Sequence, residues 1–318
     1  MRFCACPPAG SVVRCSARAD CPKQIFTTMK YSLLPALAVA AMFLANPPTS
    51  SAAAPVGTGP GFKGPVGLQL YSLRAQFAKD VPGTLDKVRD LGFKHVELAG
   101  TYGLKPEEFK AMLDARGLKP VAGHFSYEKY RDDVESIAKE AKALGLEYAG
   151  CAWIPHQDPF DEKTLQAAIE VFNKAGEALA KHGVKFYYHV HGYEFQPTAD
   201  GTLFDRLMKE TKPEFVNFQM DVFWVVFPGQ DPAKLFDKYG HRWVMTHLKD
   251  MKKSTVTGAL TGHTDVENDV AIGTGLIDFP PLLKAAARAG VKWHFLEDES
   301  SSVEAQLPQS LRYLENVK

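Results

Sequence analysis

Residues 162–191, EKTLQAAIEVFNKAGEALAKHGVKFYYHVH, hold the pattern that decides the fold. The first part, 162–182, repeats apolar residues every three or four positions, which predicts an amphipathic helix. Gly183 then supplies the residue type that most readily takes the left-handed conformation at a helix end. The short aromatic run 185–189 is typical of a buried strand. A helix followed directly by a strand indicates an α/β protein.

The same unit repeats on both sides of this stretch. Seven further strands are predicted at 67–71, 95–98, 120–124, 147–151, 216–221, 243–247 and 291–297. Seven further helices are predicted at 81–91, 106–115, 130–144, 203–210, 232–239, 279–289 and 303–317. Eight alternating pairs favour a parallel sheet closed into a single-domain (β/α)₈ TIM barrel. The rival, an open doubly wound sheet, would carry a Gly-rich phosphate loop, and the sequence holds no GxGxxG or Walker pattern.

The first 54 residues differ from the rest. Met29-Lys30 is followed by an apolar run at 33–45 and small residues at 50–54, the three parts of a secretory signal peptide. The apolar run is shorter than the roughly 20 residues of a membrane span, although an N-terminal anchor helix is the alternative.

These features predict three parts of the chain. Residues 1–28 are expected to be an upstream extension or a misassigned start, and 29–54 a signal peptide cleaved near Ala52–Ala54. Residues 55–318 are expected to form the barrel, in the periplasm or secreted.

The whole-chain averages hide this division. The chain has 37 Lys and Arg, 37 Asp and Glu, and five cysteines. Without the five basic and one acidic residues of the first 54, the barrel keeps 32 and 36, a net charge of −4. It also keeps one cysteine, Cys151, and so has no intrachain disulfide. The acidic balance speaks against a nucleic-acid partner, including the substrate of an abasic-site endonuclease on the same barrel.

Ionisable, polar and aromatic side chains gather at the predicted C-terminal ends of the strands, where TIM-barrel enzymes place their chemistry. They are Gln69, Tyr71, Glu97, His124, Trp153, His189, His191, Glu194, Asp221, His247, Lys249 and Glu297. Such a set is costly to bury unless its members share a task. The alternative is a collection of unrelated loop residues at the barrel mouth.

Three of these residues predict a metal site. Asp221, His247 and Glu297 follow the sixth, seventh and eighth strands, so they can converge on one ion. His189 on the fifth strand is the expected fourth ligand, and His191 lies on the same side of that strand. Imidazole and carboxylate together suit a divalent ion. We expect Mn²⁺ first, with Zn²⁺, Co²⁺, Fe²⁺ and Mg²⁺ as alternatives.

Several blocks also carry a family resemblance. They are GLQLYSLR at 67–74, YHVHGYEF at 188–195, QMD at 219–221 with Trp224, THLKD at 246–250, GTG at 273–275 before IDF at 277–279, and LE at 296–297. Together, over about 66–316, they resemble the xylose isomerase-like TIM barrels of the sugar phosphate isomerase and epimerase family. The resemblance implies four metal ligands, commonly Glu, Asp, His and Glu.

Asp221, His247 and Glu297 match the last three of those ligands, whereas His189 stands where many members have Glu. This departure puts a two-base epimerisation in doubt. The His-x-His-x-x-Glu block at 189–194 resembles a branch associated with keto sugars, including 3-keto-glycoside lyases. Glu194 remains an alternative ligand or base from this strand.

The predicted activity is removal of a proton alpha to a sugar carbonyl, giving an enediolate. Isomerisation or epimerisation is the first expectation, and β-elimination by a 3-keto-glycoside lyase is the alternative. A non-catalytic periplasmic sugar-binding protein is the alternative of another class. The expected partner is a small sugar or keto-glycoside, and a homo-oligomer is a further expectation.

Roles follow for the individual residues. Glu297, His191 and Glu194 are the candidate bases, and Lys249 would stabilise an oxyanion. For Lys249 a surface ion pair with Asp250 is an equal alternative. The candidate substrate-binding residues are Gln69, Tyr71, His124, Trp153 and Trp224.

Overall fold

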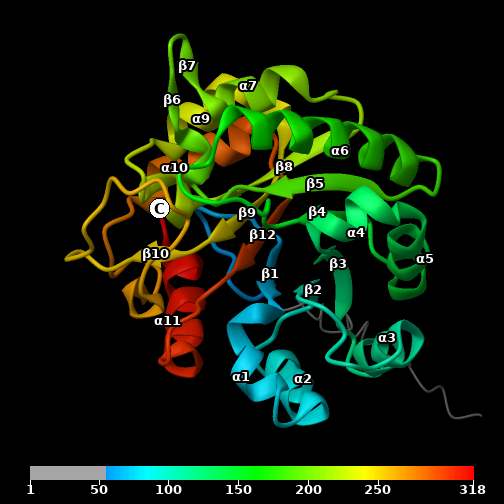
Figure 1. The fold of residues 1–318 in the computed structure, drawn as a ribbon. Helices are drawn as coiled ribbons and strands as arrows, with labels where there is room; N and C mark the ends of the chain where they lie inside the picture. Colours follow the sequence, from blue (N-terminus) through cyan, green and yellow to red (C-terminus); the bar gives the residue numbers. More distant parts are fainter. Residues whose placement is uncertain (1–54) are drawn as a thin grey trace, which may run out of the picture. The chain divides into compact units, whose positions relative to one another are not determined.

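The computed structural model describes residues 55–318 (Figure 1). The predicted extension at 1–28 and signal peptide at 29–54 lie outside these residues, so cleavage and export remain predictions. No helix within the described range is long and apolar enough to cross a membrane.

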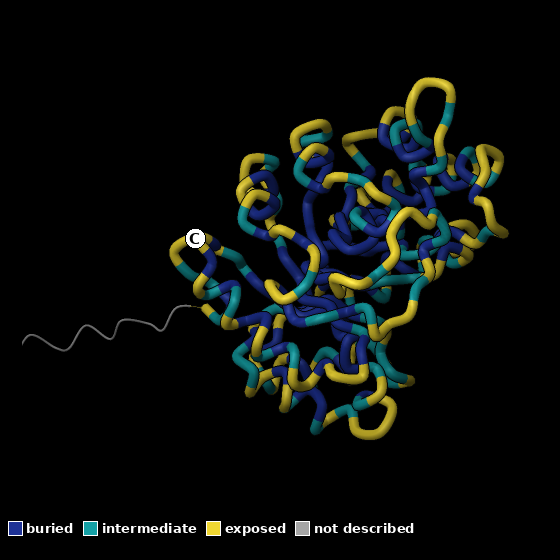
Figure 2. The backbone as a smooth tube through the Cα atoms, turned by 90° about the vertical axis from the view of Figure 1, so that its left-hand side faces the viewer, coloured by how far each residue is buried: buried dark blue, intermediate teal, exposed yellow. Residues whose placement is uncertain are grey.

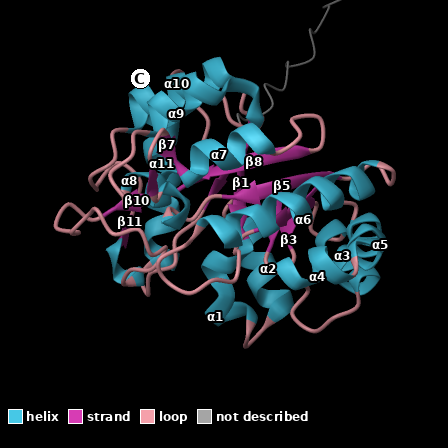
Figure 3. Ribbon diagram, turned by 45° about the horizontal axis from the view of Figure 1, so that its top comes forward, coloured by secondary structure: helices cyan, strands magenta, loops and turns pink. Residues whose placement is uncertain are grey.

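Eight parallel strands form a closed barrel, which confirms the predicted fold. Their order around the ring is β1-β12-β9-β8-β5-β4-β3-β2, and β1 pairs with both β12 and β2. The strands are β1 (Val66–Gln69), β2 (His95–Leu98), β3 (Lys119–His124), β4 (Tyr148–Cys151), β5 (Lys185–His189), β8 (Val216–Asp221), β9 (Trp243–Leu248) and β12 (Trp293–Leu296). Figure 3 shows these strands surrounded by helices.

Helices follow the strands at the predicted places. The long ones are α2 (Val81–Asp90), α3 (Pro106–Asp114), α5 (Val134–Leu144), α6 (Glu162–Ala180), α7 (Leu203–Glu210), α9 (Pro232–Tyr239), α10 (Phe279–Ala289) and α11 (Val303–Asn316). Shorter helices are α1 (Arg74–Phe77), α4 (Tyr127–Asp132) and α8 (Val222–Val226). Two-stranded ribbons are formed by β6 (Pro197–Thr198) with β7 (Gly201–Thr202), and by β10 (Asp250–Met251) with β11 (Asp269–Val270).

Several predicted boundaries differ by one or two residues from the structure, and local hydrogen bonds explain two of the differences. The helix expected at 130–144 is split at Asp133, whose non-helical backbone (φ −151°, ψ 61°) lets its side chain accept the amide of Ser136 and cap α5. The first strand ends at Gln69 rather than Tyr71. The Gln69 side chain accepts the amide of Tyr71 and starts a 3₁₀ turn over Leu70–Leu73.

Figure 2 shows buried residues at the centre of the described chain and exposed residues mainly in the loops around it. The alternation of β5 directs its side chains to two different cores. Tyr187 points into the barrel, where a small apolar core also holds Val121, Tyr148, Met245 and Phe295. Tyr188 points outward and packs on Phe172 of α6, with ring centres 5.0 Å apart. His189 therefore follows Tyr187 to the inside, above the barrel core.

Gly150 in β4 makes room for the Tyr187 ring. A Cβ atom at this position would lie 2.1 Å from Tyr187 Cζ. We expect Gly150→Ala to lower the free energy of unfolding by about 1–3 kcal/mol, because the ring has to move within a packed core. Urea unfolding would measure the loss. Gly123→Ala in the neighbouring strand β3 is the matched control. A Cβ atom at Gly123 would have the flexible Leu146 Cδ1 as its nearest contact, at 3.1 Å. Equal losses in the two variants would contradict the explanation.

Candidate metal centre and active site

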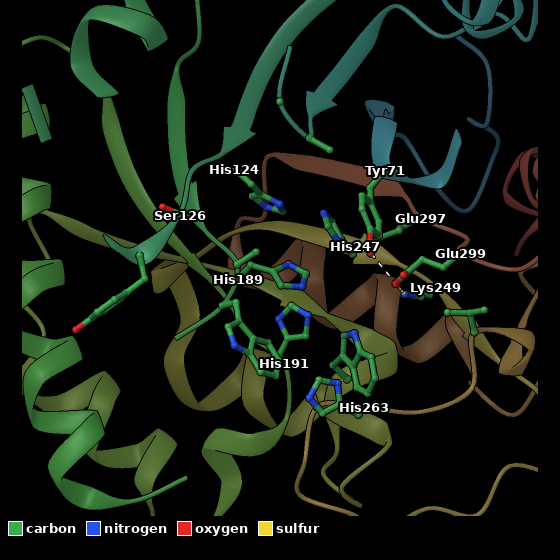
Figure 4. A pocket seen from close by; sticks show the side chains of 18 of the residues that line it. Tyr71, His124, Ser126, His189, His191, His247, Lys249, His263, Glu297 and Glu299 are labelled. Atoms are coloured by element: carbon green, nitrogen blue, oxygen red, sulfur yellow. Dashed lines mark hydrogen bonds and ion pairs between the residues drawn. The ribbon is translucent and has the colours of Figure 1, made fainter. Parts of the chain in front are cut away.

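A cavity of about 640 Å³ opens where the strands end. Figure 4 shows His124, His189, His191 and His247 gathered at its centre, with Lys249 and Glu299 beside Glu297. The cavity wall also includes Tyr71, Trp153, Trp224, His263 and Asp269. Most of the predicted site residues are therefore brought together at the C-terminal face of the barrel.

Asp221 lies beneath this cavity at the end of β8 and is completely buried. Its Oδ1 atom accepts the amides of Phe223 (2.8 Å) and Trp224 (3.1 Å), which caps the short helix α8 and holds the carboxylate still. Its Oδ2 atom is buried and has no hydrogen-bond partner. A buried carboxylate oxygen without a donor is costly, so this atom points to a cation as its partner.

His247 lies between two carboxylates. Its Nδ1 atom is 2.9 Å from Glu297 Oε2 and 3.8 Å from Asp221 Oδ2, and its Nε2 atom contacts Glu97 Oε2. Burial alone would lower the pKa of His247, but Glu97 and Glu297 outweigh it and raise the pKa well above its usual value. Both ring nitrogens of His247 are thus held by carboxylates.

His189 presents one defined nitrogen to Asp221. The Gln219 side chain donates from Nε2 to Glu97 Oε1 (2.9 Å), which leaves its Oε1 atom 2.8 Å from His189 Nδ1. His189 must therefore donate from Nδ1, so its Nε2 lone pair faces Asp221 Oδ2 at 3.9 Å. Burial, followed by the nearby His247, lowers the pKa of His189 well below its usual value and favours the neutral form that can bind a metal.

The residues present thus fit a divalent metal ion. One ligand atom each from Asp221, His247 and Glu297 lies within 4.8 Å of the others, and His189 Nε2 faces the same side of Asp221. His124, His189 and His247 form a second group with equally close ligand atoms. Mixed nitrogen and oxygen donors suit Mn²⁺, Zn²⁺, Co²⁺ or Fe²⁺. The identity of the ion remains a prediction.

Lys249 is buried beside this group and is surrounded by acids. Its Nζ atom lies 2.5 Å from Glu299 Oε1, 3.4 Å from Asp269 Oδ2 and 3.6 Å from Glu297 Oε2. Burial lowers the pKa of Lys249, but these carboxylates outweigh burial and hold the pKa well above its usual value. Burial also raises the pKa of Asp269 to about 7.

The alternative of a surface ion pair between Lys249 and Asp250 is wrong. Asp250 instead accepts the amides of Met251, Gly273, Gly275 and Ile277, and so fastens the loop that follows the β10–β11 ribbon. Lys249 and Asp250 point to different sides because they are adjacent in an extended segment.

Glu194 lies away from the metal group and outside the cavity wall. The chain turns back at Gly192 (φ 91°), so the Glu194 carboxylate accepts the Tyr188 hydroxyl and the His191 amide (3.0 Å) on the helix side of β5. Burial raises its pKa. The structure therefore favours His189 over Glu194 as the ligand from this strand, and it separates Glu194 from any substrate in the cavity.

The other predicted residues line the cavity, with the exception of Gln69. His191 lines the cavity near Trp153 and Trp224, with ring centres 5.3 and 5.6 Å away, and its buried Nδ1 atom has no hydrogen-bond partner. Burial lowers its pKa to about 3, so the ring is neutral. Tyr71 and His124 also line the cavity. Gln69 does not, because it is buried below and caps the turn at Tyr71.

Four functional residues received no role from the sequence. Glu97 and Gln219 contact the candidate ligands, and Asp269 and Glu299 surround Lys249. For two of them the sequence holds a feature that could have predicted a place in the site. Glu97 ends a strand in the same way as Asp221 and His247, and Glu299 lies two positions after Glu297.

Comparisons with known proteins identify the family of the barrel. Residues 85–317 match the family described as "Xylose isomerase-like TIM barrel". The inosose dehydratase of Lacticaseibacillus casei is 26% identical over 252 residues, which cover 70% of this chain and 83% of that protein. The inosose dehydratase of Geobacillus thermodenitrificans is 27% identical over 241 residues, covering 65% and 78%.

A solved structure of a sugar phosphate isomerase/epimerase from Parabacteroides distasonis is similar in fold. Its TM-score is 0.66 at 26% identity, and the match covers 79% of this chain and 98% of that one. The family match spans well over half of the sequence and confirms the resemblance carried by the strand-end residues. The chain belongs to the xylose isomerase-like TIM barrel family.

Proposed function

We propose that this protein is a metal-dependent lyase that removes water or an alcohol from a keto-polyol ring. The observation that carries the proposal is the convergence of Asp221, His247, Glu297 and His189 at one end of the cavity, with Asp221 Oδ2 buried and without a donor. The inosose dehydratases among its relatives support elimination as the outcome.

A divalent ion held by these four residues would polarise the substrate carbonyl and lower the pKa of the adjacent C–H. The protein's own contribution begins with Lys249, whose ammonium group lies 3.6 Å from Glu297 and can stabilise negative charge on the enediolate oxygen. Because Lys249 is held by three carboxylates, it is already oriented before the substrate arrives.

His191 is the base that the geometry favours. It lines the cavity and has an unpartnered Nδ1 atom, whereas Glu297 is engaged by His247 at 2.9 Å and Lys249 at 3.6 Å. The imidazole takes the proton from the carbon next to the carbonyl, and the C–H electrons form the enediolate. The enediolate then collapses to a C=C bond and expels the β-oxygen, which leaves as water or alcohol with the proton returned by His191.

The same site speaks for elimination over epimerisation. A two-base epimerisation needs a second proton-transfer group on the opposite face of the substrate. The strand-five position holds His189, whose Nδ1 is bound to Gln219 and whose Nε2 faces Asp221. His189 therefore has no ring nitrogen left for proton transfer once it is a ligand.

The charge of the cavity favours a substrate without phosphate. Lys249 is neutralised by Asp269, Glu297 and Glu299, and Glu128 adds a further acid to the wall. No arginine among the described residues lines the cavity. Trp153 and Trp224, which line the cavity near His191, can stack on the apolar face of a sugar ring. Export of the protein and assembly into oligomers remain predictions.

The test is incubation of the metal-loaded protein in D₂O with three substrates: an inosose, a 3-keto-glycoside and an ordinary ketose. We expect loss of water from the inosose or of alcohol from the glycoside, followed by the absorbance of the unsaturated product and by mass spectrometry. Treatment with a chelator should abolish the reaction, and added Mn²⁺, Zn²⁺ or Co²⁺ should restore it.

The other results separate the remaining functions. Deuterium at carbon without loss of water or alcohol would favour an isomerase or epimerase and would overturn the lyase. Binding of a sugar without exchange or elimination would favour a sugar-binding protein. Elimination that survives complete removal of metal would overturn the metal-dependent mechanism.

A further inference from the structure

Glu97 is the most heavily bonded carboxylate next to the candidate ligands. It lies at the end of β2 and is completely buried. Its Oε1 atom accepts the Tyr187 hydroxyl and the Gln219 amide, and its Oε2 atom accepts His247 Nε2. His124 Nε2 lies 3.3 Å from Oε1. Nothing in the proposed reaction uses Glu97 directly, so its burial calls for another explanation.

The contact with His247 decides which ring nitrogen can bind a metal. Both ring nitrogens of His247 face carboxylates, Nε2 that of Glu97 and Nδ1 that of Glu297 at 2.9 Å, and a carboxylate only accepts hydrogen bonds. An ion bound to Glu297 and Asp221 would take the place of the proton on Nδ1, whereas the contact with Glu97 retains the proton on Nε2. The lone pair is then on Nδ1, the atom that faces Glu297 and Asp221. Glu97 thereby selects the tautomer that a metal site at Asp221 needs.

Gln219 links Glu97 to His189 and so fixes the tautomer of His189 as well. Its amide donates to Glu97 Oε1 at 2.9 Å, which turns its carbonyl oxygen to His189 Nδ1 at 2.8 Å. His189 is thus left with its lone pair on Nε2, 3.9 Å from Asp221 Oδ2. One carboxylate therefore orients two imidazoles, one directly and one through an amide.

We propose that Glu97 is a positioning residue that holds His247 and His189 in the tautomers that bind the divalent ion. The inference rests on the proposed function, because it assumes the metal site at Asp221. In this role Glu97 contacts neither the ion nor the substrate.

Glu97→Gln tests the proposal because it keeps the shape and removes one acceptor atom. The amide oxygen can serve the Tyr187 and Gln219 donors, and the NH₂ group then faces His247 Nε2. His247 has to accept from that group and move its proton to Nδ1, where it blocks the metal. We expect the Kd for Co²⁺, from titration of its visible absorption, to rise about 10–100-fold.

Tyr187→Phe is the matched control. It removes another buried donor to Glu97 Oε1 and leaves the carboxylate and its contact with His247 in place. We expect it to bind Co²⁺ as the wild type does, with the same absorption spectrum. A thermal unfolding curve of each metal-free protein separates loss of metal from loss of fold.

A second measurement does not depend on folding of the variant. ¹⁵N NMR of the Zn²⁺-loaded wild type should show His247 protonated at Nε2 and His189 protonated at Nδ1, and the opposite tautomer of His247 would overturn the proposal.

An unchanged Kd for Co²⁺ in a folded Glu97→Gln protein would overturn the proposal too. So would two ions per chain with one lost in Glu97→Gln, because Glu97 would then be a ligand. Absence of metal binding in the wild type would instead overturn the proposed function itself.

Discussion

Asp221→Asn is expected to abolish binding of the divalent ion and to lower kcat/KM by about 10³-fold or more. The ion stabilises several kcal/mol of charge in the transition state, and each 1.4 kcal/mol is a factor of ten in rate. The substitution keeps an oxygen that can accept the amides of Phe223 and Trp224, so the cap of α8 is retained. Only the unpartnered Oδ2 atom is replaced, by an NH₂ group that cannot bind a metal. Elemental analysis of the purified protein and steady-state kinetics measure the two effects.

The control for Asp221 has to separate its metal-binding role from its capping role. Asp231 accepts the amides of Ala233 (2.9 Å) and Lys234 (3.2 Å) in the same way at the start of α9, and it does not line the cavity. Asp231→Ala should lower the free energy of unfolding by about 1 kcal/mol and leave the metal content unchanged. Full metal content in Asp221→Asn would show that Asp221 is not a ligand.

The barrel was predictable because its signals are local. Each strand is a short apolar run, each long helix has an apolar stripe, and both are readable within a window of about 15 residues. The strand-end position of Asp221, His247 and Glu297 follows from this pattern, because all parallel strands of a barrel end on one face. Their convergence therefore needed no knowledge of individual contacts.

The role of Glu97 was not predictable in the same way. Its partners Tyr187, Gln219 and His247 are 90, 122 and 150 positions away along the chain. A strand-end glutamate can be a ligand, a base or a positioning residue, and only the atom that it faces distinguishes these roles.

For Glu194, in contrast, the sequence analysis kept open a role that its position in the structure does not support. The resemblance of the HxHxxE block kept Glu194 open as a ligand or base, but the left-handed turn at Gly192 returns the chain toward Tyr188. A single backbone conformation after the strand moved the carboxylate to the other side of β5. Side-chain direction can be read from sequence only while the element continues.

Lys249→Met is expected to keep the metal and lose the activity, which is the reverse of a ligand variant. Without the ammonium group, the enediolate oxygen loses a preorganised cation, and kcat should fall about 10²–10³-fold. Asp269, Glu297 and Glu299 would also lose a buried counter-ion, so the free energy of unfolding should fall by about 3–5 kcal/mol. Kinetics, elemental analysis and urea unfolding of the metal-loaded protein measure the three quantities.

Lys87→Met is the matched control for the loss of an ion pair. Lys87 lies 2.6 Å from Glu304, but both side chains are more than half exposed, so the loss should be about 0–1 kcal/mol with no change in kcat. Lys249→Arg should retain most of the stability, since a cation remains among the same carboxylates, while the bulkier guanidinium displaces the charge from the substrate oxygen. If Lys249→Met retained full kcat in a folded, metal-loaded protein, Lys249 would be a structural counter-ion for Asp269 and Glu299. The enediolate charge would then be stabilised by the metal centre alone.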